Sequence, residues 1–161
     1  MSRRAQLLGD RIEQGAAALA AFAEGLSDAE WRTACSPSDK RTVGVIVHHV
    51  GNMYPVEVEL AQVLGQGKPI EGVTWAVVAD INAKHAQEKG TVSKAEALEF
   101  LRTRSKAAAD AVRKFTDEEL DRCATVSLYG DPPLTAQFFI EDHALRHSWH
   151  HLAKLRAALK K

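Results

Sequence analysis

Four of the seven histidines of this chain lie close together near its C-terminus, at His143, His147, His150 and His151. Imidazole is a common ligand of transition metals and a general acid or base near neutral pH. The surrounding stretch HALRHSWHHLAKLRAAL, residues 143–159, has the apolar spacing of an amphipathic helix. Because a helix turns its side chains to different sides, the rings can act together only where two or more of them face the interior.

The helical phase separates these four histidines. With about 100° per residue, the apolar face is centred near Leu152. His151 lies roughly 80° and His147 roughly 120° from that centre, so this pair is best placed to face the interior. His143, at roughly 160°, is one turn before His147 and is expected either to contact the outer side of this pair or to lie on the surface. His150 is almost opposite the apolar face, which predicts exposure to solvent.

An earlier helix carries a further inward histidine. His49 follows the apolar spacing of three and four residues, which places it in a core position, whereas His48 is rotated by about 100° and is expected to be solvated. The apolar stripe consists of Ile46, Met53, Val56, Leu60 and Val63.

Together these positions indicate a metal site. His147 and His151, at i and i+4, stack one ring above the other and can chelate one ion. His49 from a facing helix would complete three imidazoles and leave coordination positions for water or substrate, as in a catalytic site. Each histidine could instead be a hydrogen-bonded packing residue. As a further alternative, a cluster of His and Lys near a helix C-terminus interacts favourably with the negative end of the helix dipole. His85 is expected on the surface, with lining of the site as the alternative.

The elements that must position these residues are helical. The pattern predicts a first helix that ends at Gly25. Near its start, Asp10, Arg11 and Glu13 interrupt the apolar run, which argues for an amphipathic helix and against a secretory signal peptide. The further predicted elements are a turn opened by the capping box Ser27–Glu30, a long helix capped by Thr42 that ends near residues 65–69, a helix over 74–90, a helix opened by the capping box Ser93–Glu96, a turn with the capping box Thr116–Glu119, and a last helix capped by Thr135.

Composition restricts the classes of function. The 161 residues suit a single domain, residues 1–161, and Lys plus Arg equals Asp plus Glu at 21 each. This charge balance, without a run of basic residues, argues against nucleic acid as a partner. No apolar run is long enough to span a membrane. The isolated Cys35 and Cys123 fit a reducing, cytoplasmic compartment, with a single disulfide between them as the alternative, and each is interpreted as a packing residue.

Two segments resemble the DinB superfamily of metal-binding four-helix bundles, which includes DUF664-type proteins. TVGVIVHHVGN, residues 42–52, resembles the family's second-helix segment and implies His49 as a ligand. HSWHHLAKLRAAL, residues 147–159, resembles its last-helix signature and implies His147 and His151. Lys154 stands where the family often has glutamine, a departure outside the three histidines.

The resemblance covers nearly the whole chain and carries further implications. It implies an all-α fold, an up-down-down-up four-helix bundle with a long crossover between helices 2 and 3. It also implies a divalent metal ion (zinc, nickel or iron), a small-molecule substrate such as a low-molecular-weight thiol, and a homodimer. Family activities include thiol S-transfer, thiol-dependent isomerisation and metal-assisted hydrolysis.

Three hypotheses follow. The leading one is a metal-dependent enzyme whose three-histidine site activates a thiol or water for S-transfer or hydrolysis. The second is a non-catalytic, stress-related, dimeric bundle that binds a metal or another ligand. The third is a helical dimerisation module with packing histidines. The sequence identifies neither the substrate nor the metal, because three imidazoles suit several divalent ions.

Overall fold

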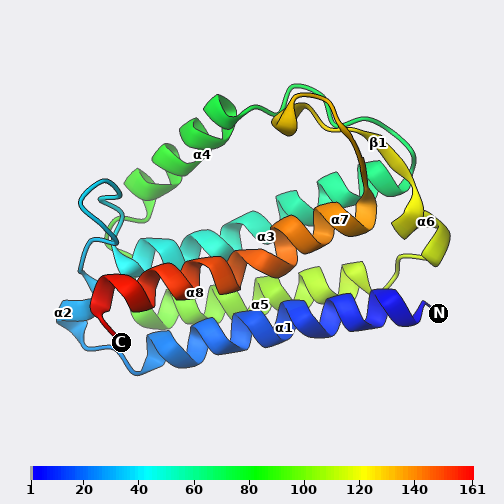
Figure 1. The fold of residues 1–161 in the computed structure, drawn as a ribbon. Helices are drawn as coiled ribbons and strands as arrows, with labels where there is room; N and C mark the ends of the chain where they lie inside the picture. Colours follow the sequence, from blue (N-terminus) through cyan, green and yellow to red (C-terminus); the bar gives the residue numbers. More distant parts are fainter. Residues whose placement is uncertain (1) are drawn as a thin grey trace.

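The computed structural model describes residues 2–161, and its core is an all-α four-helix bundle. Figure 1 shows the long helical segments of the bundle side by side. They are α1 (Arg3–Glu24), α3 (Val43–Gly65), α5 (Lys94–Val112), and a C-terminal segment built from α7 (Ala136–Ile140), the π-helical stretch η2 (Glu141–Leu145) and α8 (Arg146–Leu159).

The helix directions confirm the predicted up-down-down-up topology. α3 and α5 run parallel to each other and opposite to α1, and the C-terminal segment returns in the direction of α1 (Figure 1). Two consecutive bundle helices with the same direction require a long crossover, which covers residues 66–93. This crossover contains α4 (Trp75–Glu88), which lies outside the bundle and contacts α3 (Figure 1).

Short elements join the bundle helices at its two ends. α2 (Asp28–Trp31) follows α1, and α6 (Asp117–Asp121) follows α5. Next, β1 (Cys123–Thr125) pairs antiparallel with β2 (Pro133–Thr135), and the 3₁₀ turn η1 (Ser127–Tyr129) lies between them. The end of β2 is therefore also the start of the last bundle helix.

Side-chain caps start these helices at the residues that the sequence indicates. Ser27 and Thr116 each form a complete capping box, and Thr42 and Thr135 cap α3 and α7. At α5 only half of the predicted box forms: Ser93 accepts from the Glu96 amide, but the Glu96 carboxylate accepts from Lys89 Nζ at 2.8 Å. The cap suffices to start the helix because it already satisfies one free amide.

α3 is buried on most of its sides. It packs closely on α5, and its first turn lies under Trp31, where a Cβ on Gly44 would come within 2.5 Å of the indole. Val56, which the stripe placed in the core, is 40% exposed, so that expectation is wrong. The face of α3 that carries His49 therefore opens to solvent two turns further along.

None of the helices within residues 2–161 combines the length and the apolar run that a membrane span requires.

Candidate metal centre

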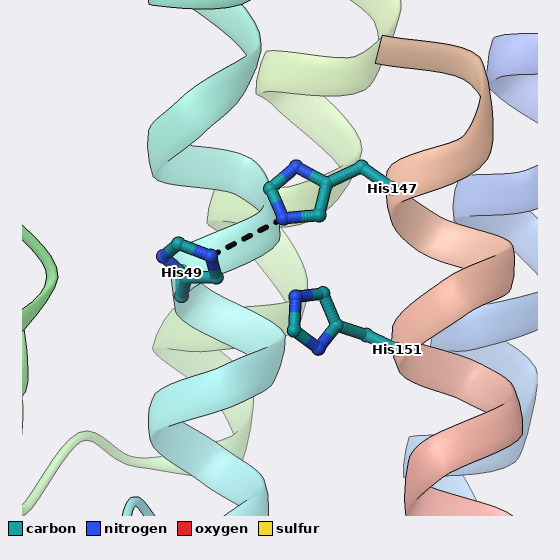
Figure 2. A group of neighbouring side chains, drawn as sticks. All are labelled: His49, His147 and His151. Carbon is teal, nitrogen blue, oxygen red and sulfur yellow. Dashed lines mark hydrogen bonds between the residues drawn. The ribbon is translucent and has the colours of Figure 1, made fainter. Parts of the chain in front are cut away.

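The structure brings His49, His147 and His151 together between α3 and α8. One ring nitrogen of each lies within 4.8 Å of the other two, and Nε2 of His49 is 3.2 Å from Nε2 of His147. Figure 2 shows the three rings turned toward a common point, one from α3 and two from α8. These are the three residues that the sequence proposes as ligands.

Local structure explains the convergence. His147 and His151 are one helical turn apart on α8, with ring centroids 4.9 Å from each other, as the i, i+4 spacing requires. The π-helical stretch η2 ends directly before Arg146 and sets the phase with which α8 presents His147. Such stretches often occur at functional sites. The phase of the histidine pair is therefore fixed by η2 as well as by the cap at Thr135.

Burial keeps two of the three rings neutral. His49 and His151 are 4% and 7% exposed. Desolvation, with the neighbouring His147 adding to it, lowers the pKa of His49 to about 2 and also lowers the pKa of His151 well below its usual value. Because a metal ion binds only the unprotonated nitrogen, these rings are available as ligands at neutral pH.

A buried carboxylate stands behind the third ring. Oε1 of Glu57 lies 2.7 Å from Nδ1 of His147, on the side of the ring opposite to Nε2. The distance is short enough for a hydrogen bond, although the ring N–H direction does not meet the oxygen in hydrogen-bond geometry. Carboxylates in this position orient ligating histidines and make them more basic. The sequence analysis missed Glu57, although its place eight residues after His49, roughly 80° away on the wheel, was a signal.

Buried polar atoms that lack a hydrogen-bond partner within residues 2–161 concentrate around this group. They are Arg41 Nη1, His49 Nδ1, Glu57 Oε2, Asn82 Oδ1, His85 Nδ1 and His147 Nδ1. Native proteins leave few such atoms unsatisfied, and a bound ion or a catalytic role is one explanation for them. The donor set and these atoms together fit a divalent metal ion with its ligand molecules.

His48 and His85 form a second histidine pair beside the group. Nδ1 of His48 is 2.8 Å from Nε2 of His85, and the His48 ring stacks on Phe100 at 4.2 Å. The expectation that His48 is solvated is wrong, because α4 supplies His85 and α5 supplies Phe100 to cover that side of α3. Burial and the neighbouring His85 lower the pKa of His48 to about 4.

His85 does not lie on the surface, contrary to the expectation: it is 6% exposed, and its ring centroid is 5.8 Å from that of His49. It therefore borders the three-histidine group from α4. The sequence could not show this, because His85 is the buried residue of a helix whose other side chains are largely exposed.

The remaining histidines of the last helix lie outside the group. His143 stacks on Phe139 at 4.2 Å, and its Nε2 lies 2.8 Å from the hydroxyl of Tyr129, which donates to Asp142 at 2.5 Å. His143 therefore lies beside the His147–His151 pair and is not one of the three converging rings. His150 is exposed, as predicted.

The arrangement can hold one metal ion through three nitrogens. Three imidazoles suit zinc, nickel and iron, and three protein ligands leave coordination positions open for other molecules. His147 is the most exposed of the three ligand candidates, so the site is reachable from solvent on its side. The cysteines are not part of it: Cys35 and Cys123 are both unpaired, and burial raises the pKa of Cys35 to about 11.

Comparisons with known proteins agree with the bundle. The sequence model that describes the DinB superfamily matches residues 11–155 of this chain. YfiT from Bacillus subtilis, described as a probable metal-dependent hydrolase with an unusual four-helix bundle topology, superposes with a TM-score of 0.78 at 16% identity over 99% of this chain and 89% of YfiT. DfsB, described as a sibling lethal factor precursor, gives 0.74 at 18% identity over 99% and 97%. No curated protein sequence matches the chain.

Proposed function

Since this chain belongs to the DinB superfamily, we propose that it is a metal-dependent enzyme whose His49, His147 and His151 hold one divalent ion, zinc, nickel or iron. The observation that carries the proposal is the convergence of three ring nitrogens within 4.8 Å, two of them on deeply buried rings with lowered pKa values. Packing histidines alone would not require this common focus.

The reaction we propose is S-transfer from a low-molecular-weight thiol, or hydrolysis of a small molecule. A divalent ion in this site supplies Lewis acidity and lowers the pKa of a thiol or water that shares it. The protein's part is to keep the rings of His49 and His151 unprotonated and to fix the His147 ring through the Glu57 carboxylate. The description of YfiT as a probable metal-dependent hydrolase favours the hydrolytic branch.

The proposed setting is a cytoplasmic homodimer. The unpaired Cys35 and Cys123 are consistent with a reducing compartment. α4 exposes Trp75, Val77 and Ile81, apolar side chains of the kind that dimer interfaces cover. Light scattering on the purified protein distinguishes the dimer from a monomer.

The test of the enzyme proposal begins with metal content. We expect tag-free protein to bind one ion per chain and His147→Ala to lose it, while the control His150→Ala, in an exposed position of the same helix, keeps it. Metal-loaded protein should then turn over a thiol–electrophile pair or an activated ester, and a chelator should abolish that turnover. Metal content that is not stoichiometric, or that His147→Ala leaves unchanged, contradicts the site. Tight binding without turnover on either substrate type instead supports the non-catalytic binding bundle.

A further inference from the structure

One ring nitrogen of His49 has no partner on the side away from the metal centre. Nε2 of His49 faces Nε2 of His147 at 3.2 Å, so Nδ1 lies on the other side of the ring (Figure 2). This Nδ1 is buried and has no hydrogen-bond partner within residues 2–161. When Nε2 of a neutral histidine binds a metal ion, the proton is on Nδ1, and ligating histidines almost always donate it to an acceptor. An acceptor is therefore expected next to the His49 ring.

His85 of α4 is the buried polar side chain that borders this ring. It is 6% exposed, and its ring meets that of His49 edge-on, with the centroids 5.8 Å apart. Nδ1 of His85 is also buried and lacks a partner in the described part of the chain. Two neighbouring rings thus each hold one unsatisfied nitrogen, which costs free energy. A hydrogen bond between the two nitrogens, direct after a small ring rotation or through one water molecule, would satisfy both.

The second nitrogen of His85 determines which ring can donate. Nε2 of His85 lies 2.8 Å from Nδ1 of His48, and both rings are neutral because burial lowers the pKa of each. A neutral imidazole has one donor and one acceptor nitrogen. If His85 donates from Nε2 to His48, its Nδ1 is left as an acceptor, which is what His49 needs. The opposite tautomer would leave buried N–H groups on both His49 and His85 without an acceptor.

The packing of α4 holds His85 in this position. α4 lies outside the four-helix bundle, and His85 is its buried residue (Figure 1). Phe100 of α5 stacks on the His48 ring at 4.2 Å and so fixes the ring to which His85 is bonded. The long crossover therefore brings one polar side chain to the α3 side of the three-histidine group.

We propose that His85 is a positioning residue for the metal ligand His49: its Nδ1 accepts the Nδ1–H of His49, directly or through one water, while its Nε2 donates to His48. This inference rests on the proposed function, because it takes His49 as a ligand. It also gives two ligands different partners, the Glu57 carboxylate for His147 and a neutral imidazole for His49. A neutral partner orients the ligand without adding negative charge, which leaves more of the ion's charge to act on a bound thiol or water.

Two amide substitutions of His85 separate this role from a purely structural one. The asparagine amide is attached where Nδ1 is, and the glutamine amide reaches the position of Nε2. His85→Asn therefore keeps an acceptor beside His49, whereas His85→Gln keeps the contact with His48. We expect the Zn²⁺ affinity, measured by competition with a chromophoric chelator, to stay close to the parent's in His85→Asn and to fall by about ten- to a hundredfold in His85→Gln. The control Gln87→Ala, exposed on the same helix, should bind as the parent does.

A residue that only braces α4 against α3 predicts the reverse order of affinities, and that order overturns the proposal. So do equal losses in both variants, which would make His85 a direct ligand, and unchanged affinity in both.

If the parent does not bind Zn²⁺ at the histidines, the proposed function fails, and the hydrogen bond is tested separately in metal-free protein at pH 7. Long-range proton–nitrogen NMR should then find the ring proton of His49 on Nδ1 and that of His85 on Nε2. The opposite tautomer in either ring refutes the inference, also where a variant of His85 does not fold.

Discussion

Glu57 offers the sharpest perturbation of the metal centre that leaves the ligands in place. Its carboxylate is 6% exposed and contacts Nδ1 of His147 at 2.7 Å, while Oε2 has no partner within residues 2–161. Glu57→Gln keeps the side-chain volume, removes the charge behind the ring and replaces one acceptor oxygen with an NH2 group. The variant therefore isolates the electrostatic support of one ligand.

The expected magnitude follows from that geometry. Removing a carboxylate behind a ligating histidine costs about ten- to a hundredfold in metal affinity, which is about 1.4–2.7 kcal/mol. The free energy of unfolding of the metal-free variant should stay within about 1 kcal/mol of the parent's, because the amide keeps the side-chain volume and the contact that changes lacks hydrogen-bond geometry. The loss should therefore fall on the metal affinity and spare the fold.

The assay is competition for Zn²⁺ against a chromophoric chelator at fixed pH, with urea unfolding of the metal-free proteins alongside. Glu59→Gln is the matched control, since Glu59 is exposed on the same helix and should bind Zn²⁺ within about twofold of the parent. Equal affinities for the two variants would refute the role given to Glu57. So would a large loss of stability without a loss of affinity.

Two further predictions concern the fold that carries the site. Gly44→Ala should destabilise the protein by about 1–3 kcal/mol, because its Cβ would meet Trp31 at 2.5 Å, whereas Gly25→Ala, with 3.7 Å to its nearest neighbour, should have little effect; urea unfolding of the two variants tests this. The metal-free protein should lose stability as the pH falls from 7 to 5, because the folded pKa values of His49 (about 2) and His151 lie below the unfolded value near 6.5, so the unfolded chain binds more protons. The slope is up to about 1.4 kcal/mol per pH unit for each ring, His49→Gln should flatten it, and unfolding midpoints that do not change with pH would contradict it.

Periodicity predicted the helices and the inward-facing histidines because both depend on residues close in sequence, whereas the bundle topology was implied by the family resemblance. The inward positions of His49, His147 and His151 follow from apolar spacing within single helices, and caps such as Thr42 and Thr135 act within one turn. Local signals of this kind do not depend on how the helices pack.

The errors arose where the packing of a distant element decides. His48 looked solvated because α3 was treated as a helix with one buried face, but α4 and α5 cover its other side with His85 and Phe100. Glu57 is a charged residue whose burial depends on tertiary neighbours, so hydropathy alone gave no reason to assign it to the site.

X-ray absorption spectroscopy of Zn²⁺-loaded protein tests the central claim most directly. We expect a first shell of nitrogen and oxygen atoms near 2.0–2.1 Å, with the multiple scattering of three imidazoles. His49→Ala, His147→Ala and His151→Ala should each reduce or abolish the bound zinc. A shell that contains sulfur, or imidazole scattering that persists unchanged in all three variants, would contradict the claim that these histidines form the metal centre.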